Sequence, residues 1–247
     1  MGIISYVKSF GEKTLYFPGK FTSENLVEES RNYQEILGKL GVSFILMDLY
    51  LDSGIGFYQN GYKKEAKRNA EKIYGLFKEN LVTRVIVSSP EDYYMFKEVY
   101  PILVRGWDIK VEYILLLILD QLRTRGTRYL GREEDREIVS YQDSCISARY
   151  LGITDEPREI IEILGGRLKE IRNSKEDVLC CGAGGGMLDN NPKLAEECGQ
   201  RRAMGIPEDS SKFICGSGLC HFNLRKHSEK SIEISSFILS KLRGLGV

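Results

Sequence analysis

Two adjacent cysteines followed by a run of glycines are the residues of this chain best suited to chemistry. Cys180 and Cys181 stand directly before Gly182, and three more glycines occupy positions 184–186. Adjacent cysteines form only a strained disulfide, but two neighbouring thiolates can both ligate one polynuclear metal centre. The glycines let the backbone approach such a centre, with N–H groups free to point at an anionic cluster. These residues indicate a metal site, with an iron–sulfur cluster as the first interpretation.

Three further cysteines flank the pair at long, regular distances. Cys145 lies 35 residues before Cys180, and Cys215 and Cys220 lie 34 and 39 residues after Cys181. Structural cysteines buried in a core are one alternative, because a free cysteine often behaves as a small apolar residue. However, core cysteines rarely cluster beside glycine runs, and in a reducing compartment clustered cysteines indicate metal or redox chemistry.

A zinc site is the second alternative. Zinc takes four cysteine or histidine ligands, and His221 directly follows Cys220, so this set could supply them. His221 is more simply interpreted as a core or interfacial histidine. Cys198 is expected in a helix, away from the clusters, as a core residue.

The composition narrows the classes of function. The chain has 247 residues, and its 35 Lys and Arg balance its 35 Asp and Glu, which argues against a nucleic-acid-binding tract or a polybasic membrane anchor. The first ten residues resemble no signal peptide, and the longest aliphatic run, residues 114–119, is far shorter than the ~20 residues of a membrane span. We therefore expect a cytoplasmic protein without a membrane span, in which this run is a buried helix.

The two halves of the chain share a spacing pattern. In the first half, Ser89 and Asp92 follow Ser53 by 36 and 39 residues. In the second half, Ser217 and Cys220 follow Cys181 by the same two distances. The spacing predicts two similar units, 1–123 and 124–247, joined through a charged linker at 124–137, of which only the second is competent to bind metal.

Strand and helix patterns alternate within each unit. Short apolar or β-branched runs predict buried parallel strands at residues 15–18, 42–47, 83–88, 138–141, 167–171 and 212–215. Apolar residues at helical spacing predict helices at 62–77, at 156–164 and from Pro192 to about Met204. The expected fold class is α/β, with two pseudo-repeated Rossmann-like units and ligands at loops that follow strand ends.

The residues around Cys145, the Cys180-Cys181-Gly182 run and the segment from Leu219 to Leu224 resemble the cysteine-rich CCG-domain family. That family includes the B-type subunit of heterodisulfide reductase and iron–sulfur subunits of anaerobic glycerol-3-phosphate, lactate and succinate oxidation systems. Its motif is a single cysteine, then Cys-Cys-Gly, then Cys-x-x-Cys, usually present in two copies. The resemblance implies a 4Fe-4S-type cluster, cubane or non-cubane, in each complete copy.

Carried onto this chain, the resemblance implies ligands at Cys145, Cys180, Cys181 and Cys220. The first cysteine of Cys-x-x-Cys is replaced by Ser217. Either Cys215, two residues earlier, takes part through a rearranged loop, which we expect, or the cluster has four cysteine ligands. The first unit has lost all its motif cysteines, which have become Lys20, Asp52, Ser53, Ser89 and Asp92. We expect no metal there, and an ion pair between Lys20 and the two aspartates in its place.

The resemblance implies an oxidoreductase subunit of a heterodisulfide-reductase-type complex, inactive as an isolated chain. One cluster would exchange electrons with flavin- or ferredoxin-type iron–sulfur subunits, and act on a thiol, disulfide or persulfide substrate. One alternative is an electron-transfer subunit of a lactate, glycerol-3-phosphate or succinate dehydrogenase. Another is a zinc-stabilised interaction module without a redox role.

Overall fold

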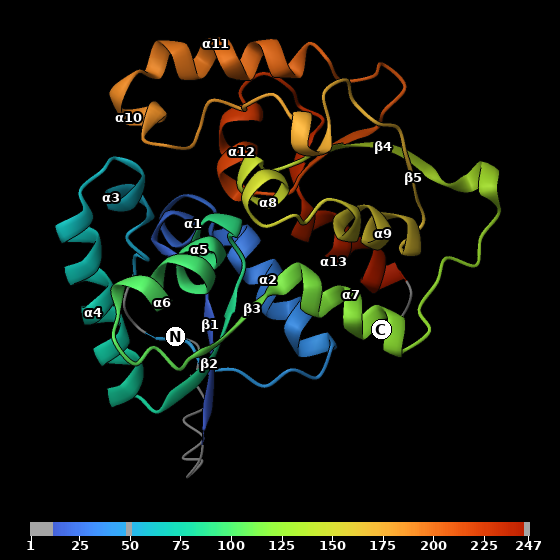
Figure 1. The fold of residues 1–247 in the computed structure, drawn as a ribbon. Coiled ribbons are helices and arrows are strands. Elements are labelled where there is room, and N and C mark those ends of the chain that lie inside the picture. Colours follow the sequence, from blue (N-terminus) through green and yellow to red (C-terminus); the bar gives the residue numbers. More distant parts are fainter. Residues whose placement is uncertain (1–11, 48–50, 245–247) are drawn as a thin grey trace.

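The computed structural model describes residues 12–47 and 51–244, which form two parallel β-sheets surrounded by helices (Figure 1). The first sheet has the order β1-β2-β3 and the second β5-β4-β6-β7. The strands of the first sheet are β1 (Lys13–Phe17), β2 (Val82–Val87) and β3 (Lys110–Tyr113). Those of the second are β4 (Glu137–Gln142), β5 (Gly166–Leu168), β6 (Lys212–Cys215) and β7 (Ser231–Glu233). The predicted α/β class with parallel sheets is confirmed.

Helices connect the strands of both sheets, as parallel pairing requires. Those of the first part are α1 (Lys20–Asn25), α2 (Val27–Lys39), α3 (Ile55–Gln59), α4 (Lys63–Glu79), α5 (Pro90–Tyr94), the π-helical turn η1 (Met95–Val99), α6 (Tyr100–Leu103) and α7 (Ile114–Thr124). The rest are η2 (Glu133–Asp135), α8 (Cys145–Tyr150), α9 (Asp155–Ile163), η3 (Lys175–Asp177), α10 (Met187–Asn190), α11 (Pro192–Ala203), α12 (Gly218–Leu224) and α13 (Ile234–Gly244). The helices expected at 62–77, 114–119, 156–164 and 192–204 are all present within a few residues.

One expected strand is wrong, and two strands were missed. Among residues 42–47, Ile45 forms only an isolated bridge to Leu15, with Ile45 N–H donating to the Thr14 carbonyl at 2.8 Å. The rest of that run is irregular, and residues 48–50 lie outside the described residues. Strands β3 and β7 were not predicted, because β3 carries a lysine and a glutamate in four residues and β7 has only three residues.

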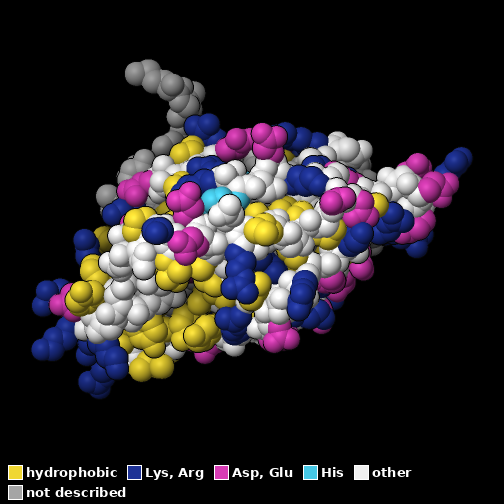
Figure 2. All heavy atoms as spheres, turned by 90° about the horizontal axis from the view of Figure 1, so that it is seen from above, with side chains coloured by type: hydrophobic (Ala, Val, Ile, Leu, Met, Phe, Trp, Pro, Cys, Tyr) yellow, Lys and Arg dark blue, Asp and Glu magenta, His cyan; other side chains and the backbone are white. Residues whose placement is uncertain are grey.

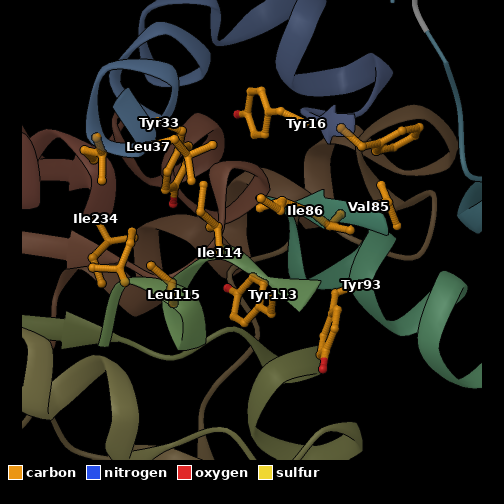
Figure 3. Close-up of a cluster of buried hydrophobic side chains, with 14 of the residues drawn as sticks. Tyr16, Tyr33, Leu37, Val85, Ile86, Tyr93, Tyr113, Ile114, Leu115 and Ile234 are labelled. Atoms are coloured by element: carbon orange, nitrogen blue, oxygen red, sulfur yellow. The ribbon is translucent and has the colours of Figure 1, made fainter. Parts of the chain in front are cut away.

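The core runs through both sheets without a break. Figure 3 shows Tyr33 and Leu37 of α2 beside Ile114 and Leu115 of α7, with Ile234 of α13 close to them. Helices α2 and α13 also pack together, and the Tyr33 hydroxyl donates a 2.7 Å hydrogen bond to the buried Glu233. Each sheet lies within one of the ranges 1–123 and 124–247, but the division into two units stays a prediction.

The face that carries α10 and α11 exposes apolar side chains between charged ones (Figure 2). Leu194 in α11 and Met204 directly after it are 41% and 81% exposed. Within the described ranges, no helix combines the length and the hydrophobicity that a bilayer crossing needs.

Candidate metal centre

The cysteines gather at one edge of the second sheet. Cys145 is the first residue of α8, which follows β4, and Cys220 lies in α12, which follows β6. Strands β4 and β6 are parallel neighbours, so their carboxyl ends meet at the same edge. The loop with Cys180 and Cys181 crosses this edge after η3. Local sequence fixes the helix starts, since the Ser144 hydroxyl caps α8 by accepting from the N–H of Ile146.

The thiols lie close to one another. The Cys181 and Cys220 sulfurs are 3.0 Å apart, and both side chains are buried. The Gly182 N–H donates to the Cys180 sulfur at 3.3 Å, as expected for a glycine loop that cradles an anion. Cys180 is exposed and Cys145 is half-buried. Two of the three segments therefore meet at Cys181 and Cys220, and Cys145 lies near enough to Cys180 for their charges to interact.

Cys215 has a different environment from the other four. It ends β6, is fully buried, and its sulfur lies 3.5 Å from the Ser231 hydroxyl oxygen. It packs in the same small apolar cluster as Cys181 and Cys220. The hydroxyl of Ser217 points elsewhere, donating to Glu91 at 3.0 Å. Participation of Cys215 in the metal centre stays a prediction.

Crowding and burial hold these thiols in the protonated form. The pKa of Cys180 is raised by its hydrogen bond with Cys181 and by burial. Burial, and next the charge of Cys180, raise the pKa of Cys145. The hydrogen bond from Cys181 lowers the pKa of Cys220, but burial and Cys215 outweigh it and raise that pKa to about 11. Several thiolates can coexist here only with positive charge between them, which iron ions supply when bound.

A buried guanidinium beside the thiols fits such an anionic centre. Arg202 of α11 is 2% exposed, donates from Nε to Gln142 at 2.5 Å and from Nη1 to the Arg172 carbonyl at 2.7 Å. In the described part of the chain its Nη2 has no hydrogen-bond partner. Burial lowers its pKa, whereas Asp143 and the thiols of Cys220, Cys215 and Cys181 act in the opposite direction. The incompletely hydrogen-bonded guanidinium of Arg202 could interact favourably with an anionic, thiolate-bound cluster.

Gly182 is required where α11 packs closely against the glycine loop. Gly182 has φ +85°, and a Cβ there would stand 2.4 Å from the Ala195 carbonyl oxygen. Gly185 and Gly186 also have positive φ. Across the described residues, no three His, Cys, Asp or Glu side chains converge on a single-ion position. In an iron–sulfur cluster each iron takes its own ligand, so the donors surround the centre rather than meet at one point.

The corresponding place in the first sheet holds carboxyl and hydroxyl groups. The Ser53 hydroxyl donates to Asp92 at 2.5 Å, and Ser89 caps α5 by accepting from the Asp92 N–H at 3.1 Å. Burial raises the pKa of Asp92 to about 7. The expected ion pair is wrong. Lys20 is exposed, and of the two aspartates Asp92 accepts from Ser53 while Asp52 accepts from the Gly54 N–H.

The predictions for His221 and Cys198 have different outcomes. His221 is 8% exposed, hydrogen-bonds Ser231 through Nδ1 at 3.0 Å, and burial lowers its pKa to about 4, so a packed, neutral histidine is confirmed. Cys198 does lie in a helix, but not away from the other cysteines. Its Cβ would be 2.9 Å from a Cβ on Gly182, because α11 packs directly over the glycine loop.

Sequence reasoning missed Arg202 and Glu91. Both are charged residues within helices, a pattern that normally indicates a solvated face. Both are instead buried, at 2% and 7% exposure. For Glu91 the signal was its place in Ser89-Pro90-Glu91-Asp92, the segment aligned with Ser217 to Cys220.

A cleft with a volume of ≈ 890 Å³ is lined by residues 183–186 and 218–219, which adjoin Cys181 and Cys220 in the sequence, but by none of the candidate ligand cysteines. It runs between α1 and α3 on one side and the glycine loop with α10 and the start of α12 on the other. In Figure 1 α3 and α10 face each other at this place. Glu91, Ser89 and Asp92 reach its wall, as do residues 183–186.

Fold and site define a cysteine-rich domain that carries a thiol centre at the carboxyl edge of a parallel sheet. Residues 139–225 match the family model of the CCG cysteine-rich domain, so this part of the chain belongs to that family. A probable iron-sulfur-binding oxidoreductase, FadF of Bacillus subtilis, is 30% identical over 172 residues, which is 69% of this chain and 23% of FadF. Lactate utilization protein A of Oceanobacillus iheyensis is 27% identical over 77% of this chain and 79% of its own length.

The D-type subunit of the dihydromethanophenazine:CoB–CoM heterodisulfide reductase of Methanosarcina barkeri is 23% identical over 91% of this chain and 56% of its own length. Residues 139–225 thus match a CCG domain, and the chain is similar to iron–sulfur oxidoreductases and heterodisulfide reductase subunits. It spans about a quarter of FadF and about half of the Methanosarcina protein. Among solved structures, an aspartate racemase homologue from Pyrococcus horikoshii covers 95% of this chain with 14% identity and a TM-score of 0.38.

Proposed function

We propose that this chain is the iron–sulfur component of a heterodisulfide-reductase-type redox complex, similar to its B-type subunit, and carries one 4Fe-4S-type cluster. The ligands are Cys145, Cys180, Cys181 and Cys220, with Cys215 as a candidate for the fifth position. The observation that carries this proposal is the convergence of the three motif segments, with the Cys181 and Cys220 sulfurs 3.0 Å apart. The unsatisfied buried Arg202 supports a negative charge at the same place.

When bound, such a cluster supplies one-electron chemistry and an iron that can take a sulfur ligand. The chain's own residues would hold it and set its surroundings. Burial of Cys181 and Cys220 keeps water away from one side of the centre, while exposure of Cys180 leaves the other side open. The adjoining cleft gives a thiol, disulfide or persulfide substrate a route to the centre. Electrons would come from a flavin- or ferredoxin-type subunit in the cytoplasm, so the isolated chain would not turn over.

A second candidate is an electron-transfer subunit of a lactate, glycerol-3-phosphate or succinate dehydrogenase. It is favoured by the similarity to lactate utilization protein A, of which this chain matches 79%. In that role the centre would relay electrons without binding a sulfur substrate. Electron paramagnetic resonance separates the two roles, because only a substrate-binding centre changes its spectrum when a thiol or disulfide is added.

The first experiment is the content of iron, zinc and acid-labile sulfide in protein purified without oxygen. We expect about four iron and four sulfide per chain, and little of either in a Cys181→Ser variant. Cys198→Ser is the matched control, because this cysteine lies beside the site but outside the motif. About one zinc per chain with no sulfide would instead establish a zinc-stabilised interaction module and exclude the redox proposal.

A further inference from the structure

Glu91 in α5 is one of the buried acidic residues of the described chain, and the one whose carboxyl reaches the cysteine-bearing half. Its side chain is buried, with 7% of the residue exposed, although a carboxylate normally stays in water. Its oxygens accept hydrogen bonds from two hydroxyls, Ser217 at 3.0 Å and Ser89 at 3.1 Å. Within the described ranges it pairs with no lysine, arginine or histidine. A buried carboxyl without a cationic partner is either protonated or lies beside a bound cation.

The position of Glu91 favours a bound cation. Ser217 directly precedes α12, without capping it through its side chain, and stands where the complete motif has the first cysteine of Cys-x-x-Cys, three residues before Cys220. The carboxyl of Glu91 meets this serine from the other sheet, across 126 residues of sequence. Helix α5 also packs against α8, whose first residue is Cys145. The carboxyl thus lies between two of the segments that hold the thiols.

In the part of the chain described, no lysine or arginine forms an ion pair with this carboxyl that would offset its charge. A cation bound among these groups would offset the carboxylate and the thiolates together.

We propose that Glu91 is an oxygen ligand of the metal centre and takes the place of the cysteine that Ser217 replaces. This inference rests on the proposed function, and it assigns the fifth position to Glu91 instead of Cys215. The first half, which has lost its own motif cysteines, would then still serve the metal centre of the second half. Ser217 orients the carboxylate through its hydroxyl, and Ser89 holds the second oxygen. A carboxylate is a harder ligand than a thiolate, so the iron that it holds differs electronically from those bound only by sulfur.

The test compares Glu91→Gln with the matched control Asp92→Asn. Glutamine keeps an oxygen that can accept from Ser217 but lacks the charge that a metal ligand needs. We expect Glu91→Gln to lose iron to a chelator on the order of 10-fold faster than the wild type, with a changed Mössbauer and electron paramagnetic resonance spectrum. Asp92→Asn removes the adjacent buried carboxyl, which accepts a hydrogen bond from Ser53 and not from Ser217. This variant should keep the wild-type rate of iron loss and the wild-type spectra.

Restoring a thiol separates a ligand from a structural residue. In a Glu91→Ala background, Ser217→Cys should recover iron retention, because it returns a donor at the position that the motif lost. Circular dichroism shows whether each variant is folded. If the wild type holds iron and sulfide but Glu91→Gln has the same spectra and retention, this inference alone is wrong. If the wild type holds no iron, the proposed function fails and this inference fails with it.

Discussion

Charged side chains buried around sulfur distinguish this site at the scale of single residues. Arg202 and Glu91 lie beside it in α11 and α5. Arg202 has one nitrogen without a hydrogen-bond partner, and Glu91 accepts hydrogen bonds only from serine hydroxyls. Removing a charge from water is costly, so charged residues are buried mainly where an opposite charge lies close by. The net negative charge of a thiolate-bound iron centre would offset Arg202, whereas the charge of Glu91 would be offset only by a direct bond to an iron ion.

The first prediction concerns Arg202. Replacing it by methionine removes a positive charge that stabilises added electrons, so we expect the reduction potential of the cluster to fall in Arg202→Met. Arg202→Lys keeps the charge and should shift the potential much less, although it loses the hydrogen bond to Gln142 or that to Arg172. Potentiometric titration followed by electron paramagnetic resonance measures both. Equal potentials in the wild type and in Arg202→Met would contradict a role for this charge.

At the scale of elements, the glycine loop and α11 position the cysteine pair. Helix α11 begins after Asn191, whose side chain caps it by accepting from the Leu194 N–H, and continues over the loop. The Asn223 amide of α12 donates to the carbonyls of Cys181 and Ala195, at 2.7 Å and 2.9 Å. One side chain thus ties three segments together, which explains why the loop can hold two thiols in a fixed position.

The second prediction tests this packing. Gly182→Ala forces φ +85° on an L-residue and places its Cβ 2.4 Å from the Ala195 carbonyl. We expect it to destabilise the protein by about 2–4 kcal/mol. Gly184→Ala is the matched control, since a Cβ there meets nothing within 4 Å, and should change stability by less than about 0.5 kcal/mol. Denaturant unfolding of both variants gives the comparison, and equal stabilities would refute the tight contact with α11.

At the scale of the whole molecule, buried carboxyls join the two sheets. Glu233 on β7 accepts hydrogen bonds from the Tyr33 hydroxyl of α2 and from the Ser235 N–H, each at 2.7 Å. Burial raises its pKa from 4.5 to about 7, although those hydrogen bonds oppose the shift. The folded protein therefore binds this proton more tightly than the unfolded chain does.

The third prediction follows from that proton. Protonated Glu233 contributes to the free energy of unfolding, and this contribution is fully present below pH 4.5. It is lost as the pH rises through about 7, a change of about 3 kcal/mol. We expect the free energy of unfolding of Glu233→Gln to decline less than that of the wild type between pH 4.5 and 7. Urea unfolding of metal-free protein across that range measures it, with Glu137→Gln as a control because the pKa of Glu137 is lowered to about 2. An unchanged slope in Glu233→Gln would show that Glu233 titrates normally.

The set of thiols and the α/β pattern could be predicted from the amino-acid sequence alone. Cysteine spacing and hydrophobic periodicity are local signals, and β6 was predicted at its observed bounds because a short apolar run between polar residues suffices to mark a buried strand. The resemblance to the CCG family needed only the same local motifs, and the comparison with known proteins confirms it for residues 139–225.

The surroundings of the thiols, in contrast, depend on how distant elements pack. The hydrogen bond between Ser217 and Glu91 joins residues 126 positions apart, and no periodicity marks such a pair. Burial of Arg202 likewise depends on how α11 lies over the sheet edge. The expected ion pair of Lys20 is absent from the described residues because Asp92 accepts from the Ser53 hydroxyl instead. Sequence patterns report which side of an element is apolar, whereas the partners of a buried charge are set by the packing of elements far apart in the chain.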